Sequence, residues 1–282
     1  MTRIDAHTHL FAPAQALGRA ALCARDATFA EMYRDPKARM AAAPDLIAAM
    51  DQAEIDRAVV AGFAFGAERD LVDQNDYVLA SAAEARGRII PLATVNPAHA
   101  GWELFALEAL AAGARGFGEL RPHNQGWDPL GPEGLTLCEL ARAHDAVLLW
   151  HVSEPVGHVY PGKRGGISPV ELCELATAFP GVKMIAAHLG GGVSFYLQMP
   201  EVRKAIESVY FDTAASSLLY DETSVARLVE LAGAERVLFG SDYPLLSPGS
   251  QLQRVIALLS GEAARAVCGD SADTLFSEKN TS

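Results

Sequence analysis

Short apolar segments recur along the chain, and a stretch with helical periodicity follows each of them. Eight can be counted, at residues 3–10, 57–64, 88–95, 114–121, 146–152, 183–190, 209–215 and 237–244. Most begin roughly 25–37 residues after the one before, the length of a strand–loop–helix–loop unit. Nearly continuous apolar strands are typical of a parallel sheet buried on both faces.

Helix signals between these segments support the same reading. Ser168-Pro169-Val170-Glu171 has the form of a capping box with proline at the first helical position, and Pro180-Gly181 ends the helix. Eight such units without a change in composition predict an α/β chain, a (β/α)8 TIM barrel forming a single domain over residues 1–282. A doubly wound open sheet explains eight strands less well, since such sheets usually have about five or six.

One stretch does not fit the regular spacing. The first interval runs from residue 3 to residue 57, so residues 11–43 are extra material between the first strand and its helix. This segment contains Tyr33-Arg34-Asp35-Pro36 and is a candidate lid over the barrel mouth. A short surface excursion is an equally acceptable interpretation.

Composition narrows the class of protein. The chain has 282 residues, of which 50% are hydrophobic and 21% charged, so it can bury a sizeable core and is not a disordered chain. The net charge of −12 disfavours nucleic acid and anionic membranes as partners, but a small anionic substrate stays compatible with it.

Localisation can also be predicted. The four cysteines form no CxxC pair, which favours reduced thiols. No apolar signal segment opens the chain, and no run reaches about 18 apolar residues. We therefore expect a cytoplasmic protein without a membrane span.

Polar residues of one chemical kind gather at the ends of the predicted strands. His7 and His9 are two apart on the first strand and share a face. The fourth strand carries Glu119, and the fifth, sixth and eighth end in His151, His188 and Asp242. In a barrel these ends converge on one face, where active sites are built. Imidazoles and carboxylates buried there without partners would be costly, whereas a divalent metal uses both as ligands. Although any one of these residues could be a hydrogen-bonded rim residue, the set together predicts a metal site.

Four motifs carry a family resemblance, IDAHTH (4–9), WHVSEP (150–155), AAHLGGG (186–192) and LFGSDYP (238–244). The chain resembles the amidohydrolase superfamily, most closely its amidohydrolase-related branch, which includes aminocarboxymuconate-semialdehyde decarboxylase. The resemblance implies metal ligands at His7, His9, His151 and Asp242. It makes His188 catalytic in one-metal members and a ligand in two-metal members.

Glu119 departs from many one-metal relatives but matches deoxyribonuclease-like relatives, in which a glutamate helps to hold a second metal. We therefore expect one or two divalent ions, Zn²⁺ first and Mn²⁺ as the alternative. With two ions, Glu119 would bridge one ion on His7, His9 and Asp242 and another on His151 and His188. The alternative for Glu119 is a salt bridge to Arg121 or Lys163.

The resemblance favours a metal-dependent hydrolase in which a metal-bound water cleaves an amide, lactone or ester bond of a small molecule. His188 or Asp242 would move the proton. The alternative is a metal-dependent lyase, a decarboxylase or hydratase of a small carboxylic acid. A barrel without enzymatic activity is the third reading, and the full ligand set disfavours it.

Loop residues after strands four and five are candidates for contacts with the substrate. They are Arg121, His158, Tyr160 and Lys163. A cation such as Arg121 could clamp a substrate carboxylate, although a solvated surface loop is the alternative for this region. Many relatives form dimers, so a homodimer is expected by analogy.

Overall fold

The computed structural model describes residues 2–277, and eight parallel strands alternate with helices over this range. The strands are β1 (Ile4–His9), β2 (Arg57–Ala61), β3 (Ile89–Pro91), β4 (Gly116–Leu120), β5 (Val147–Trp150), β6 (Met184–Ala186), β7 (Val209–Asp212) and β8 (Val237–Leu238). Each lies inside a segment predicted from the apolar pattern. The observed strands are shorter because the polar ends of those segments leave the sheet and form the site.

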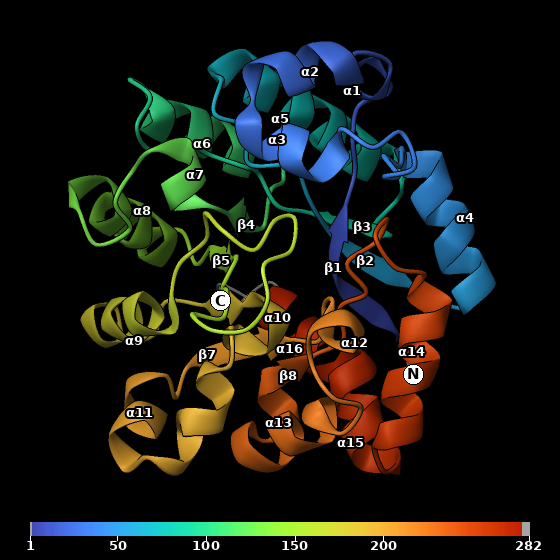
Figure 1. Ribbon diagram of the computed structural model, residues 1–282, viewed down its shortest axis with the longest axis vertical. Helices are drawn as coiled ribbons and strands as arrows, with labels where there is room; N and C mark the ends of the chain where they lie inside the picture. Colours follow the sequence, from blue (N-terminus) through green and yellow to red (C-terminus); the bar gives the residue numbers. More distant parts are fainter. Residues whose placement is uncertain (1, 278–282) are drawn as a thin grey trace, which may run out of the picture.

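Helices surround the strands (Figure 1). The α-helices before β4 are α1 (Pro13–Leu17), α2 (Arg19–Arg25), α3 (Ala27–Tyr33), α4 (Ala43–Ala53), α5 (Glu68–Glu84) and α6 (Trp102–Ala111). Those from β4 to β7 are α7 (Pro122–Gln125), α8 (Pro132–Ala143), α9 (Pro169–Ala178), α10 (Ala187–Gly190) and α11 (Pro200–Ala205). The remaining ones are α12 (Ser216–Leu219), α13 (Ser224–Ala232), α14 (Pro248–Leu258), α15 (Gly261–Arg265) and α16 (Ser271–Phe276). Three further helical turns are η1 (Val193–Gln198), η2 (Ala234–Arg236) and η3 (Ala266–Asp270).

The strands form two arcs that meet at both ends. One arc has the order β1-β2-β3 and the other β4-β5-β6-β7-β8, and all neighbours within an arc are parallel. A parallel bridge between Ala93 and Phe117 joins β3 to β4, and another between Thr8 and Tyr243 joins the end of β8 to β1. The sheet therefore closes into the TIM barrel that the spacing predicted.

Apolar side chains fill the barrel at the end where the strands begin. Ile4, Val59, Ile90, Val147 and Ile185 belong to one buried cluster with Ala272, Leu275 and Phe276 of α16. Because this end is packed with apolar residues, polar chemistry is left to the opposite end, where the strands finish. A larger cluster fills the layer between the strands and the surrounding helices.

Residues 11–43 form the three short helices α1, α2 and α3, drawn in blue beside α5 in Figure 1. Phe11 and Phe29 pack in one buried cluster with Phe63 and Phe65, which follow β2. Arg25 of α2 forms an ion pair with Asp70 of α5, and the shorter of their contacts is 2.5 Å. The segment therefore packs against the residues after β2 and against α5.

Local signals in the sequence explain several element boundaries. Ser168 accepts a hydrogen bond from the Glu171 amide and Glu171 accepts one from the Ser168 amide, so the predicted capping box opens α9. No helix within residues 2–277 is both long and apolar enough to cross a bilayer.

Candidate metal centre

Six side chains predicted as metal ligands meet at the end of the barrel where the strands finish. They form two groups of potential ligands, one of His7, His9 and Asp242 and the other of Glu119, His151 and His188. Within each group one donor atom per residue lies within 4.8 Å of the others. The structure thus brings together residues that are up to 235 positions apart, which the predicted barrel requires.

Unusual backbone conformations turn two of these side chains into the site. His188 and Asp242 have φ angles of 58° and 62°, in the left-handed region that residues other than glycine rarely adopt. Glycine makes room for a third: a Cβ on Gly166 would lie 2.2 Å from the His151 carbonyl oxygen. The backbone around the site is therefore shaped to aim these groups at one point.

The candidate donor atoms within each group lie close together. In the first group Nε2 of His7 lies 3.0 Å from Nε2 of His9, and Oδ1 of Asp242 lies 3.9 Å from Nε2 of His7 and 3.5 Å from Nε2 of His9. In the second, Oε1 of Glu119 lies 2.7 Å from Nδ1 of His151 and 3.3 Å from Nε2 of His188. Ligand atoms about 2.0–2.2 Å from a tetrahedral ion are separated by roughly 3.3–3.6 Å. The contacts of Asp242 with His9 and of Glu119 with His188 fall in this range, and the other three lie outside it.

Glu119 belongs to the second group but also lies close to the first. Its Oε1 is 3.9 Å from Nε2 of His7, and its Oε2 is 3.9 Å from Nε2 of His9. The alternative of a simple salt bridge to Arg121 or Lys163 does not describe this position, because the nearest partner of the carboxylate is the His151 imidazole.

Asp212 holds the His7 side chain and the backbone of His188 in place. Its Oδ2 accepts a 2.7 Å hydrogen bond from Nδ1 of His7, and its Oδ1 accepts from the amides of His188 at 2.9 Å and Ala214 at 3.0 Å. Both carboxylate oxygens are therefore used, and the side chain is fully buried. Holding Nδ1–H of His7 in this way leaves Nε2 free to face the other ligands.

The pKa values in the cluster follow from its charge balance. Burial lowers the pKa of His7, but Asp212, Glu119 and Asp242 outweigh burial and raise it to about 10. Burial alone would raise the pKa of Glu119, and the imidazoles of His151, His188 and His7 hold it well below its usual range instead. Burial and then the neighbouring Arg121 lower the pKa of His151 to about 4. Carboxylates in this cluster thus stay ionised and draw positive charge to themselves.

A divalent cation fits this donor set. Three carboxylates converge on the imidazoles, and Arg121 is the one guanidinium buried beside them within residues 2–277. Imidazole nitrogens also face each other at 3.0 Å for His7 and His9 and 3.2 Å for His151 and His188. Two lone pairs at such distances repel unless a proton or a metal ion lies between them. Neutral imidazole and carboxylate are ligands that Zn²⁺ and Mn²⁺ accept.

The cluster opens into a cavity of about 510 Å³. Its walls come mainly from apolar side chains of the segment after β1, the loops after β2 and β8, and helix α12, which follows β7: Met32, Ala38, Phe63, Ala64, Leu218, Leu219 and Leu245. The yellow-green loop between β5 and α9 crosses in front of the strands in Figure 1 and adds His158 and Tyr160 to the wall. A volume of this size suits a small organic molecule.

The residues predicted to bind substrate divide into two sets. Arg121, His158 and Tyr160 line the cavity. Lys163 does not: its ammonium donates to the carbonyls of Val156, at 2.5 Å, and His158, at 2.8 Å, and so holds its own loop. The contacts of Lys163 therefore stabilise the loop and do not reach the cavity.

Arg121 has a second role that its position in the sequence does not reveal. Its Nη2 donates to the carbonyls of Gly162 at 2.5 Å and Arg164 at 2.6 Å, while its Nη1 lies 3.3 Å from Nδ1 of His151. The guanidinium is 3% exposed and its Nε has no hydrogen-bond partner among residues 2–277. It therefore ties the loop after β5 to the candidate metal centre.

The sequence pattern missed the apolar and aromatic walls. Met32, Tyr33, Phe63 and Leu218 carry no motif, and the only hint was the lid hypothesis for residues 11–43. Asp212, which is fully buried and accepts a hydrogen bond from His7, also belongs to none of the four motifs.

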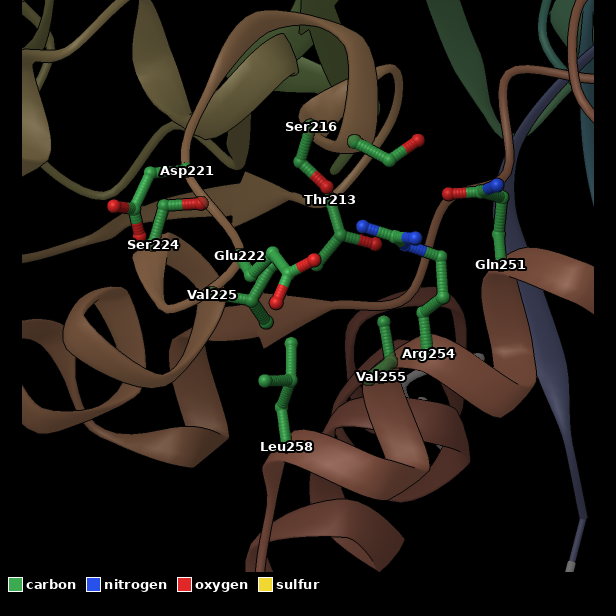
Figure 2. Close-up of a pocket in the computed structure, with 11 residues that line it drawn as sticks. Thr213, Ser216, Asp221, Glu222, Ser224, Val225, Gln251, Arg254, Val255 and Leu258 are labelled. Atoms are coloured by element: carbon green, nitrogen blue, oxygen red, sulfur yellow. The ribbon is translucent and has the colours of Figure 1, made fainter.

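A second cavity, of about 20 Å³, lies apart from the cluster (Figure 2). Arg254 of α14 extends toward Thr213, and Ser216, Glu222 and Gln251 also line the space. This volume holds about one water molecule, so the larger cavity is the candidate site.

Comparisons with known proteins agree with this geometry. The model of the family described as Amidohydrolase matches residues 4–277. A comparison with curated proteins gives no match. The chain is similar in structure to 5-carboxyvanillate decarboxylase from Sphingomonas paucimobilis, with 14% identity, a TM-score of 0.78 and 98% of each chain covered.

Two other solved structures extend the comparison. The 5-carboxyvanillate decarboxylase of Novosphingobium aromaticivorans, complexed with manganese and 4-hydroxy-3-methoxy-5-nitrobenzoic acid, has 16% identity and a TM-score of 0.77, over 98% of this chain and 96% of that one. The 2,6-dihydroxybenzoate decarboxylase from Rhizobium has 12% identity and a TM-score of 0.72, over 98% of each chain.

These comparisons correct the activity predicted from the sequence. The expected hydrolysis of an amide, lactone or ester bond is wrong, because the similar solved structures are mostly decarboxylases. The error has a physical origin: the same His and Asp ligands serve hydrolases and lyases, so the ligand motifs do not distinguish the two reactions. The lyase alternative agrees better with these findings.

Proposed function

Because the chain belongs to the amidohydrolase family, we propose that it is a metal-dependent decarboxylase of a small carboxylic acid. The observation that carries the proposal is the apolar-walled cavity of about 510 Å³ whose floor is the two-part ligand cluster. Loss of CO₂ turns a hydrated carboxylate into an apolar product, so an apolar enclosure next to a cation favours it. The decarboxylases similar in structure support the same reaction class, and three of these structures hold manganese.

The residues proposed to hold the cation are His7, His9, Glu119, His151, His188 and Asp242. One ion would sit on the first group of three, and a second could share Glu119 with His151 and His188. When bound, such an ion supplies Lewis-acid stabilisation of the negative charge that develops as the carbon–carbon bond breaks. Mn²⁺ is favoured by the related structures, and Zn²⁺ stays the alternative.

The chain's own groups complete the reaction. The bond from the substrate carbon to its carboxylate breaks, its electron pair stays on that carbon, and CO₂ leaves. The carbon then takes a proton. Burial would raise the pKa of Asp242, but His9, His7 and His188 lower it to about 2, so this carboxylate holds no proton of its own. We propose that Asp242, whose side chain is 13% exposed, takes the proton from a water molecule in the cavity and passes it to the carbon, and that the hydroxide left behind joins the CO₂ as bicarbonate. His188 donates from Nδ1 to the carbonyl of Ala214 at 3.1 Å, so its Nε2 is turned toward the cluster and positions the reacting groups.

Arg121, His158 and Tyr160 are the proposed substrate contacts. Arg121 provides a buried positive charge beside the cluster for a substrate carboxylate. Tyr160 donates its hydroxyl hydrogen to Oε2 of Glu154 at 2.8 Å, which leaves its oxygen lone pairs for a donor on the substrate. The segment 11–43, which supplies Met32 and Tyr33 to the wall, is proposed as a fixed lid over the cavity.

Product analysis in labelled water tests the reaction. Protein loaded with Mn²⁺ is incubated with 2,6-dihydroxybenzoate, 5-carboxyvanillate and a panel of other hydroxylated aromatic acids. We expect CO₂ release from at least one acid, with one deuterium from D₂O on the carbon that lost it and activity abolished in Asp242→Asn. Absence of CO₂ from every acid, together with entry of ¹⁸O from water into the products of an ester and lactone panel, would contradict the proposal.

Two further points belong to the same proposal. Titration with Mn²⁺ followed by mass spectrometry decides the number of ions, and a ceiling of one per chain rejects the pair bridged by Glu119. We also propose a homodimer, which light scattering after gel filtration tests. A mass of about 30 kDa at micromolar concentration contradicts the dimer.

A further inference from the structure

The lid places a tyrosine against the candidate active site. Tyr33 is the last residue of α3 and lines the same cavity as His9, Glu119 and Asp242. Its side chain is therefore part of the site although no motif marks it.

Neighbouring rings hold the phenol in one orientation. The Tyr33 ring stacks on Phe29 with centroids 4.9 Å apart and an interplanar angle of 22°. It meets Phe11 edge to face at 4.9 Å and Phe63 at 5.9 Å. Aromatic contacts on three sides fix the ring plane, so the hydroxyl projects from a rigid support.

The backbone of the same segment is clamped as well. Nη1 of Arg19 donates to the carbonyl of Tyr33 at 3.4 Å and to that of Asp35 at 2.8 Å, and its Nη2 donates to Ala38 at 2.8 Å. One guanidinium therefore fixes both the end of α3 and the turn that follows. The position of Tyr33 is set before any ligand enters.

The Tyr33 hydroxyl has no partner in the part of the chain that the structure describes. Among residues 2–277 it makes no hydrogen bond, and it is not one of the polar atoms shut away from solvent without a partner. Burial, and then the carboxylates of Asp242 and Glu119, raise the pKa of Tyr33 above its ordinary value, so the hydroxyl keeps its proton. It is a preformed donor that faces the cavity.

We propose that the Tyr33 hydroxyl is a specificity-determining contact, which donates a hydrogen bond to an oxygen substituent of the substrate other than the reacting carboxylate. The inference rests on the proposed function for its substrate class, a small aromatic acid. Tyr160 lines the same cavity, and its hydroxyl hydrogen is already donated to Glu154, so it can only accept a hydrogen bond from the substrate. Tyr33 would therefore contact a substituent that accepts a hydrogen bond, and Tyr160 one that donates. A substrate substituent that accepts at Tyr33 is thereby distinguished from one that can only donate.

The test compares ligands with and without the substituent in matched variants. Binding of benzoate, 3-hydroxybenzoate and 4-hydroxybenzoate to Mn²⁺-loaded protein is measured by calorimetry for wild type, Tyr33→Phe and Tyr196→Phe. Tyr196 is 58% exposed and lies outside the cavity, so it controls for loss of a hydroxyl alone. The Phe variant keeps the ring contacts, and metal content and thermal midpoint are checked for each protein.

We expect wild type to prefer one hydroxybenzoate over benzoate by about tenfold, the size of one neutral hydrogen bond. Tyr33→Phe should lose this preference while its affinity for benzoate changes less than twofold, and Tyr196→Phe should keep it. No preference in wild type, or an equal preference in Tyr33→Phe, overturns the proposal. The binding experiment does not depend on turnover. Absence of CO₂ release in the separate assay would therefore contradict the proposed function, and it would leave the result for the Tyr33 contact unaffected.

Discussion

Replacement of Asp212 by asparagine should weaken metal binding although Asp212 is not one of the proposed ligands. Oδ1 of Asp212 accepts two backbone amides, from His188 and Ala214, while Oδ2 accepts Nδ1–H of His7. In Asp212→Asn the amide oxygen must stay on the two backbone donors, which turns the NH₂ group toward His7. Two donors then face each other, and His7 can relieve the conflict only by moving its proton to Nε2, the nitrogen that faces His9 and Glu119.

The size of the effect follows from the role of the buried carboxylate. Loss of the group that orients a ligating histidine typically lowers metal affinity by about 10–100-fold, or about 1.4–2.7 kcal/mol. We expect this loss for Mn²⁺ in competition with a chromophoric chelator, with the circular dichroism spectrum unchanged. Asparagine has nearly the same shape as aspartate, so we expect the variant to keep the native fold. The thermal midpoint of the variant checks this directly.

Asp221→Asn is the matched control. Asp221 follows the same strand in a surface turn, where it accepts from the amide of Thr223 at 2.8 Å and touches none of the proposed ligands. Its affinity for Mn²⁺ should equal that of wild type. An Asp212→Asn protein that binds Mn²⁺ within twofold of wild type would refute the role given to this carboxylate.

Three further outcomes are expected. Removal of metal with EDTA should lower the thermal midpoint by at least about 4 °C, because an ion that binds the native state and not the unfolded state stabilises the native state. An unchanged midpoint in calorimetry would argue against such a site. Ser168→Ala should lower the free energy of unfolding by about 1 kcal/mol in urea, since it removes the cap of α9, while metal content stays constant; an equal stability would show that the cap is not formed. Arg121→Lys should loosen the loop after β5, because one ammonium cannot reproduce the paired contacts of the guanidinium with Gly162 and Arg164. This variant should have a higher KM and be cleaved faster within residues 156–164 in limited proteolysis. Cleavage at the wild-type rate would show that Arg121 does not hold the loop.

The sequence was most informative where one physical rule dominates. Apolar strands at the spacing of a βα unit predicted all eight strands and the closed barrel, because burial on both faces leaves little choice of residue. The same rule identified the site, since His151, His188 and Asp242 interrupt apolar segments at the end where parallel strands converge. Their meeting in two groups of three agrees with that prediction of position, and their roles as ligands stay a proposal.

Other features depend on contacts that no local pattern records. Tyr33 reaches the cavity through the packing of α3 on Phe11 and Phe63, and Lys163 turns back onto its own loop instead of toward the cavity. The motifs also could not predict the reaction, because a cation held by imidazoles and carboxylates supports both hydrolysis and decarboxylation. The apolar walls that favour loss of CO₂ come from residues such as Met32 and Leu218, which are indistinguishable from ordinary core residues in the sequence.

The most direct test of the account is the metal content of protein loaded with Mn²⁺, freed of loose ions by gel filtration and measured by mass spectrometry. We predict at least one ion per chain in wild type and less than a tenth of one in the double variant His7→Ala/Asp242→Ala, with both proteins folded by circular dichroism. A folded wild-type protein that retains no ion, or a double variant that retains as much as wild type, would contradict the claim that this cluster is a metal centre.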